Sequence, residues 1–138
     1  MADTLELSIS NDLPELARLA AAVGTFLEQR QVPPKAAYAV NLALEELVSN
    51  VIKYAHDDAS GHAIDVAVAV ESDGLVVRIE DDGRPFNPLE APEPELDLPL
   101  EERKVGGLGI HLVRDLAGPI RYERRGNRNR LEVRISLD

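Results

Sequence analysis

Residues 63–81 constrain the fold most, because they form two consecutive strand patterns joined by a turn signal. Apolar side chains alternate with small or polar ones over Ala63–Val70, and in Leu75–Asp81 the apolar residues Leu75, Val77 and Ile79 share one face. This two-residue period is typical of half-buried strands. Ser72-Asp73-Gly74 between the two segments favours a hairpin turn. An antiparallel hairpin with one apolar face needs a covering layer, which the rest of the chain has to supply.

The second strand ends on a carboxylate that is turned toward the apolar face. By parity, Asp81 shares its face with three apolar residues, Leu75, Val77 and Ile79. A carboxylate on the core side is costly unless a polar group meets it. Asp81 is therefore a candidate acceptor for an exocyclic amine such as that of adenine, and Gly83 would let the backbone approach a flat ring closely. The alternative is an ordinary turn, since Asp-Gly is a common turn dipeptide.

The chain before this hairpin predicts a strand and a helix. Residues 4–10 alternate between apolar and polar side chains, as a half-buried strand does. A helix is expected from Asn11-Asp12 to about Arg30, with Asp12 and Glu15 spaced as a capping box. Pro33-Pro34 then separates this helix from a second one.

The second helix, expected to end near Ala55–Asp58, carries a polar stripe. At 100° per residue, Glu46, Asn50 and Lys53 fall close together, opposite the apolar positions Val40, Leu44, Leu47 and Val51. A carboxylate at this place can accept a proton, an amide oxygen suits Mg²⁺, and a lysine can approach a phosphate. The alternative is a solvated helix face, because polar helix faces are the rule.

The C-terminal half predicts a long loop, a short helix and a closing hairpin. Residues 87–105 have four prolines and neither period, which indicates a loop. A helix is expected over Leu108–Ala117, and strands over Ile120–Arg124 and Arg130–Leu137. With no sign of a second domain, residues 1–138 predict one α+β domain. We expect a two-layer sandwich with a mixed, mostly antiparallel sheet and helices on one face.

The glycines that open the short helix form a third candidate segment, Gly106-Gly107-Leu108-Gly109. Amide groups at a helix start can bind an anion, and glycines let phosphate oxygens come close. The segment lacks the Gly-Lys-Ser/Thr of a Walker loop and the third glycine of a dinucleotide fingerprint. A glycine cluster that merely starts a helix is the alternative.

Charge and composition exclude several classes of function. A formal net charge of −10 argues against non-specific binding to nucleic acid and against docking on an anionic membrane. The chain has no cysteine, so disulfides and thiolate chemistry are excluded. The N-terminal sequence has no secretory signal pattern and no apolar run is long enough to span a bilayer, so we expect a cytoplasmic protein.

The order and spacing of the three segments resemble those of the GHKL ATPase and kinase superfamily. The matching pattern is Glu46-x-x-x-Asn50 on a helix, Asp81-x-Gly83-x-Pro85-Phe86 after a strand, and Gly107-x-Gly109 after a loop. Residues 127–133, NRNRLEV, are similar to the family's closing strand. The resemblance covers nearly the whole chain and is closest to the bacterial anti-sigma factor serine/threonine kinases.

The resemblance implies a Bergerat ATP-binding fold and assigns a role to each motif residue. Glu46 would be the general base and Asn50 the Mg²⁺ ligand. Asp81 would bind the adenine amine with Gly83 packed against the base and Phe86 in the same pocket. Gly107 and Gly109 would contact the phosphates of ATP, within the segment 106–109. Glu45 is a competitor for the base, but the family spacing selects Glu46.

Residues 87–105 would be the ATP lid, and here the chain departs from the pattern. Some relatives carry an arginine two residues before the first glycine of the Gly-x-Gly step, where this chain has Val105. Arg103 and Lys104 lie just upstream, and either of them, like Lys53 on the helix, could offset phosphate charge.

The resemblance implies an ATP-dependent kinase that phosphorylates a serine on a STAS-domain anti-anti-sigma protein. The same protein would sequester a sigma factor and act as a homodimer. Two alternatives remain open at this point. One is a nucleotide-dependent regulator that sequesters its partner without kinase activity. The other is the ATP-binding part of a histidine kinase, against which we note that no phosphoacceptor histidine precedes the first strand.

Overall fold

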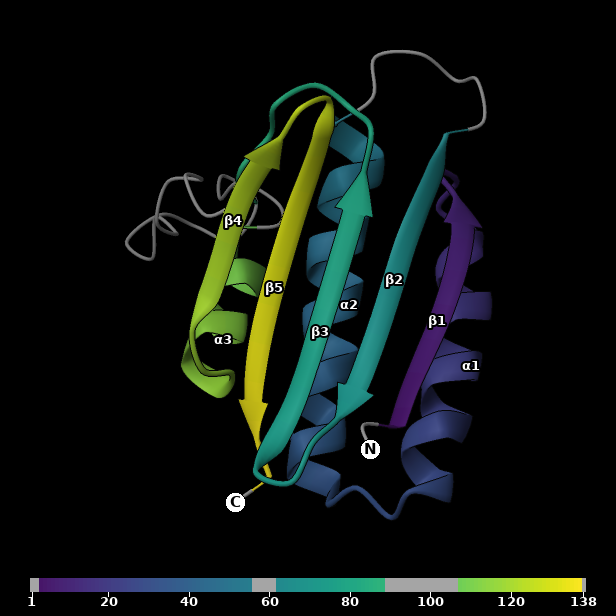
Figure 1. Ribbon diagram of the computed structural model, residues 1–138, viewed down its shortest axis with the longest axis vertical. Coiled ribbons are helices and arrows are strands. Elements are labelled where there is room, and N and C mark those ends of the chain that lie inside the picture. The colour runs from purple at the N-terminus through teal and green to yellow at the C-terminus, as the bar shows by residue number, and fades with distance from the viewer. Residues whose placement is uncertain (1–2, 56–61, 89–106, 138) are drawn as a thin grey trace, which may run out of the picture.

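The computed structural model describes residues 3–55, 62–88 and 107–137. Figure 1 shows five strands and three helices in these ranges. Their order along the chain is β1 (Asp3–Ser10), α1 (Glu15–Gln29), α2 (Pro34–Tyr54), β2 (Ala63–Val70), β3 (Gly74–Asp81), α3 (Gly107–Leu116), β4 (Ile120–Arg125) and β5 (Arg128–Ser136). The strands and helices expected from the sequence are all present, with ends that differ by a few residues. Most of the predicted lid, residues 89–105, lies outside the described ranges.

The strands form one sheet in the order β1-β2-β3-β5-β4. Each of the four pairings is antiparallel, so the expectation of a mixed sheet is wrong for the described strands. The reason lies in the connection after β3. The chain returns through α3 to β4 at the far edge, and the tight turn to β5 then brings β5 back beside β3 in the opposite direction (Figure 1). This pairing sets Asp81 of β3 opposite Asn129 of β5.

The helices cover one face of the sheet, as predicted, and the core lies between the two layers (Figure 1). The central helix α2 packs against β3, β5 and both other helices. Its buried side chains are interleaved with the inward residues of the strands, among them Ile64, Val68, Val77 and Val133, each at most 1% exposed. No helix in the described ranges is long and apolar enough to cross a membrane.

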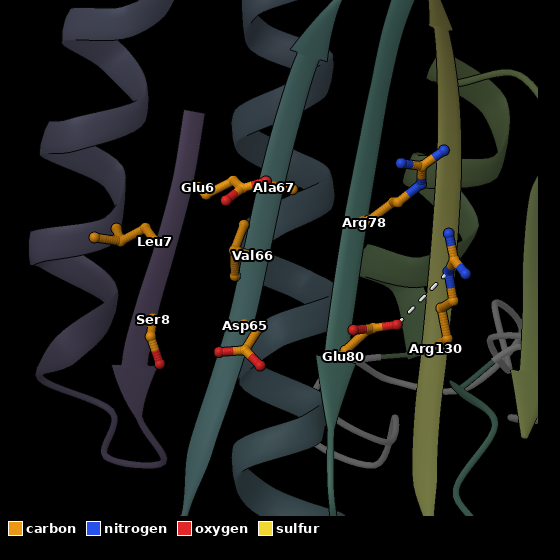
Figure 2. Close-up of a pocket in the computed structure, with 9 residues that line it drawn as sticks. All are labelled: Glu6, Leu7, Ser8, Asp65, Val66, Ala67, Arg78, Glu80 and Arg130. Carbon is orange, nitrogen blue, oxygen red and sulfur yellow. Dashed lines mark ion pairs between the residues drawn. The ribbon is translucent and has the colours of Figure 1, made fainter. Parts of the chain in front are cut away.

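The opposite face of the sheet is not covered by helices and carries several ion pairs between neighbouring strands. Arg78 of β3 pairs with Glu132 of β5 at 3.0 Å, and Arg130 lies 3.8 Å from Glu80. A hollow of about 550 Å³ lies on this face, lined by residues of β1, β2, β3 and β5. Figure 2 shows Arg78 and Glu80 of β3 and Arg130 of β5 on one side of it, and Glu6, Ser8 and Asp65 on the other. The candidate site residues singled out from the sequence do not line this hollow.

Helix α1 begins later than the sequence predicted. It starts at Glu15 rather than at Asn11-Asp12, and its cap residue Pro14 makes no side-chain hydrogen bond. The carboxylate of Glu15 instead accepts hydrogen bonds from the backbone N–H of Ser10 at 3.1 Å and from its hydroxyl at 3.0 Å. Glu15 therefore ties the helix start to the end of β1, and the predicted capping box with Asp12 is wrong.

The junction between α1 and α2 is a Schellman motif formed without glycine. The N–H of Val32 donates to the carbonyl of Leu27 at 3.1 Å, and the N–H of Gln31 donates to that of Glu28 at 3.0 Å. This turn places Gln31 at a φ of 54°, in the left-handed region that glycine favours. Helix α2 then begins at Pro34, where a missing N–H costs nothing.

Candidate functional site

Four segments from three separate parts of the sequence meet at one end of the molecule. The C-terminal end of α2, the end of β3, the end of β4 and the start of β5 lie together there (Figure 1). The loop after β3 is bonded to the end of α2, because the N–H of Arg84 donates to the carbonyl of Ala55 at 2.9 Å. The Nε of Arg84 also donates to the carbonyl of Tyr54 at 2.8 Å. The rings of Tyr54 and Phe86 add an aromatic contact, with centroids 5.7 Å apart.

Asp81 is buried at the centre of this junction, on the face that its parity predicted. It is only 1% exposed. Its Oδ2 accepts hydrogen bonds from the N–H of Gly83 at 2.8 Å and from Nδ2 of Asn129 at 3.2 Å. Two N–H donors on one oxygen compensate for part of the cost of burying the carboxylate, and they fix its orientation.

Asn129, which was not singled out from the sequence, is the hub of the junction. It is 3% exposed, and its Oδ1 accepts from the hydroxyl of Tyr122 at 2.6 Å and from the N–H of Phe86 at 3.2 Å. Its Nδ2 donates to the carbonyl of Arg84 at 2.8 Å as well as to Asp81. The sequence did hold a signal for it. Asn129 shares the parity of the buried residues of β5, Leu131, Val133 and Ile135.

Arg124 brings a guanidinium to the same junction from β4. Its Nη1 donates to the carbonyl of Gly83 at 2.7 Å and to Oδ1 of Asn129 at 3.2 Å. Gly83 is thus held on both sides, by Asp81 at its N–H and by Arg124 at its carbonyl. The loop that follows β3 is fixed by side chains of three different strands.

Gly83 itself fills a space that has no room for a side chain. A Cβ there would overlap the carbonyl oxygen of Ala55 and would lie 2.8 Å from Oδ2 of Asp81. The glycine is needed for this close approach of two backbones, whereas the approach of a flat ring to Gly83 stays a prediction.

The polar stripe of α2 is less uniform than the sequence predicted. Lys53 is exposed and Glu46 half-buried, but Asn50 is only 8% exposed, so a solvated face is wrong for that residue. The physical reason is that small residues extend the buried side of the helix toward Asn50. The buried alanines Ala39 and Ala43 lie within about 20° of Asn50 around the helix axis. The Nδ2 of Asn50 donates to the carbonyl of Glu46 at 2.9 Å, which turns the amide oxygen away from the helix backbone.

Glu46 has a raised pKa, and burial is the main cause. Desolvation disfavours its charged form, and repulsion from Glu45 raises the pKa further, while Lys53 opposes both effects. Glu45 itself is exposed and lines a separate hollow of about 300 Å³ between α1 and α2, with Leu16 and Leu44. The two glutamates therefore face different sides of α2.

Helix α3 starts at Gly107, one residue earlier than predicted, and packs against α2. Its C-terminal end lies beside the start of α2, since Leu116 and Ala36 line the same hollow. The first turn of α3 therefore points toward the half of α2 that carries Glu46 (Figure 1). Gly107 and Gly109 lie in this first turn, and the side chain of Leu108 is not described. The other candidates in the sequence before it, Arg103, Lys104 and Gly106, lie outside the described residues.

Comparison with known proteins agrees with this arrangement. Residues 9–135 match the sequence profile of the histidine kinase-like ATPase domain family. The chain belongs to this family. Its five-stranded antiparallel sheet with helices on one face is consistent with the Bergerat ATPase fold that the resemblance implied. Membership of the histidine kinase-like ATPase domain family implies that the chain binds ATP.

Among curated proteins, this histidine kinase-like ATPase domain is similar to the serine/threonine-protein kinase BtrW of Bordetella bronchiseptica. The two are 26% identical over 135 residues, which cover 95% of this chain and 91% of BtrW. At this identity the relation is distant, although it extends over nearly the full length of both chains.

Proposed function

We propose that this chain is an ATP-dependent protein serine/threonine kinase of a partner-switching system, with residues 1–138 acting as one domain. Its substrate would be a serine on a STAS-domain anti-anti-sigma protein, and it would also sequester a sigma factor as a homodimer. The family supports ATP binding, and the name of BtrW supports transfer to serine or threonine. The identities of the partner proteins rest on the sequence resemblance alone.

The observation that carries the proposal is the partial burial of Glu46 and the raised pKa that results from it. A general base works best when its pKa is raised toward the operating pH, and partial burial of Glu46 has that effect. Glu46 would take the proton of the serine hydroxyl as that oxygen attacks the transferred phosphoryl group. Lys53, which lowers the pKa of Glu46, would keep this carboxylate ionised enough to act and would offset charge on the phosphates.

Asn50 is the residue proposed to hold Mg²⁺. The described residues contain no group of three or more His, Cys, Asp or Glu side chains that could hold a metal ion by themselves. Mg²⁺ bound together with nucleotide phosphates needs only one or two protein ligands and keeps several waters. The buried amide of Asn50 fits that role, because its nitrogen is occupied by the carbonyl of Glu46 and its oxygen points away from that bond.

The adenine would lie at Asp81 and Gly83, with Phe86 at the edge of the pocket. The resemblance places the base against Gly83, whose missing Cβ already lets the carbonyl of Ala55 approach closely. The glycines at the start of α3 would contact the phosphates through their N–H groups. Arg103 or Lys104 would offset the charge of the γ-phosphate.

Mass spectrometry after mixing the protein with Mg-ATP and a STAS-domain partner tests the proposed reaction. We expect phosphoserine on the partner, and a loss of transfer of at least about 100-fold for Glu46→Gln, the range expected for a general base. Glu45→Gln is the matched control and should retain transfer. ATP binding without phosphate on any partner would favour the alternative, a nucleotide-dependent sequestering regulator. An undiminished yield with Glu46→Gln would exclude Glu46 as the base.

A further inference from the structure

The side chain of Asn129 makes five hydrogen bonds, all of them to other residues of the protein. Its amide oxygen accepts three hydrogen bonds, from Tyr122, Phe86 and Arg124, and its amide nitrogen donates two, to Asp81 and Arg84. An Asn side chain has two N–H donors and one oxygen with two lone pairs, so both donors are already used. Asn129 therefore acts on the site through its neighbours.

These contacts permit only one orientation of the Asn129 amide. A flip would place the NH₂ group against the N–H donors of Phe86 and Arg124 and the oxygen against two acceptors, so four of the five hydrogen bonds would be lost. Only the hydroxyl of Tyr122 could turn to accept. The guanidinium of Arg124 on the oxygen also polarises the amide and makes its N–H a stronger donor. The side of Asn129 that faces Asp81 is consequently a fixed N–H donor.

The sheet register makes this contact unavoidable. Asn129 is the direct cross-strand partner of Asp81 on β3 and of Arg124 on β4. Side chains that are directly opposite on one face of an antiparallel pair lie close enough to interact. The short amide therefore connects a cation on one neighbouring strand to a carboxylate on the other.

We propose that Asn129 is a positioning residue, which holds Asp81 as a hydrogen-bond acceptor and makes the site select a base with an exocyclic amine. This inference rests on the proposed nucleotide site. With Oδ2 held by Asn129 and Gly83, the carboxylate cannot rotate to accommodate a base that presents a carbonyl at the same place. Asn129 thus contributes to discrimination between bases without touching the ligand.

Calorimetric titration with Mg-ATP and Mg-ITP tests this role, because inosine carries a carbonyl where adenine carries its amine. The readout is the ratio of the Kd for ITP to the Kd for ATP. We expect a ratio of about tenfold or more for the wild type, as for a hydrogen bond to a charged group. In Asn129→Asp an oxygen replaces the donor at 3.2 Å from Asp81, and the ratio should fall to within about threefold.

Asn127→Asp is the matched control, because it adds the same charge in the exposed turn two residues away and should keep the wild-type ratio. A purely structural role for Asn129 predicts that both nucleotides lose affinity equally. An unchanged ratio in Asn129→Asp would therefore overturn the inference. Absence of binding of either nucleotide to the wild type would contradict the proposed function itself, and the inference with it.

A second variant decides the matter if Asn129→Asp does not fold, as judged by its thermal unfolding. Tyr122→Phe removes only the hydroxyl that donates to Oδ1 at 2.6 Å, so the amide stays but is held less firmly. We expect a smaller fall of the same ratio, by about twofold, the lower end of what one hydrogen bond contributes. A wild-type ratio in Tyr122→Phe would then overturn the inference.

Discussion

The buried carboxylate of Asp81 and the buried amide of Asn129 face each other across the β3–β5 pair, 3.2 Å apart. Neither side chain is more than 3% exposed. Two polar groups inside an apolar sheet are tolerated because each satisfies the other, and further donors and acceptors complete both. The contact fixes two polar side chains at the end of the sheet, beside the C-terminal end of α2.

Gly83→Ala should destabilise the protein by about 1–3 kcal/mol, the usual cost of overpacking. The added Cβ would meet the backbone of Ala55 and the carboxylate of Asp81, and neither can move without breaking its hydrogen bond to Arg84 or to Gly83. Gly24→Ala is the control, since a Cβ within α1 meets no atom within 4 Å. That change should stabilise by about 0.5–1 kcal/mol through helix propensity. Urea unfolding of both variants measures the difference, and equal effects would contradict this packing.

The pH dependence of phosphate transfer should shift in opposite directions when the two neighbours of Glu46 are neutralised. The base works when ionised, so the rate falls as pH drops through the pKa of Glu46. Glu45→Gln removes repulsion, lowers that pKa and should move the acidic limb to lower pH. Lys53→Met removes attraction, raises the pKa and should move the limb to higher pH.

Lys35→Met, at the other end of α2, is the control for these rate profiles and should leave the limb in place. Rates of transfer measured from below the ordinary pKa of a glutamate to above neutral pH give the comparison. Shifts of the same sign in both variants would show that another group is the base.

Acid should remove a stabilising contribution of Glu15 over a defined range of pH. Hydrogen bonds from Arg18 and from Ser10 lower the pKa of Glu15 from 4.5 to about 2. Because the folded-state pKa is depressed, the contribution is complete above the unfolded value of 4.5 and is lost as pH falls through about 2. The difference in unfolding free energy between wild type and Glu15→Gln should therefore shrink across that interval. A difference that stays constant over the interval would contradict the assigned contacts.

Gln31→Gly should stabilise the protein by about 0.5–1 kcal/mol. Gln31 adopts a φ of 54°, a conformation that costs about 1–2 kcal/mol for a residue with a Cβ and that glycine adopts freely. Part of this gain is offset, because glycine gives the unfolded chain more conformational entropy to lose on folding. Ala21→Gly, in the exposed middle of α1, is the opposite control and should cost about 1 kcal/mol. Thermal unfolding of the two variants gives the comparison. A loss of stability in Gln31→Gly would mean that the side chain contributes more than its backbone strain costs.

The sequence was most informative where periodicity alone decides the outcome. The two-residue period placed Asp81 on the buried face, and the same rule applied to β5 would have found Asn129. Asn50 was harder to place, because the small side chains of Ala39 and Ala43 bury that side of α2 although they add little apolar area. The Schellman motif at Gln31 could not be predicted, because no glycine marks it in the sequence. The capping box was predicted wrongly, because the carboxylate of Glu15 accepts a hydrogen bond from Ser10 at the end of β1.

The most direct test of the account is a calorimetric titration of Mg-ATP into the wild type, Asp81→Asn and Asp82→Asn. Asn can still accept from Gly83 and Asn129 through its oxygen, so the fold should survive while an acceptor toward the ligand becomes a donor. Asp82 has the opposite parity and is the matched control. We expect the wild type and Asp82→Asn to bind alike and Asp81→Asn to lose about tenfold or more, a larger loss than any change in the stripe of α2. Equal affinity of all three proteins, or no binding by the wild type, would contradict the assignment of the ATP pocket to Asp81.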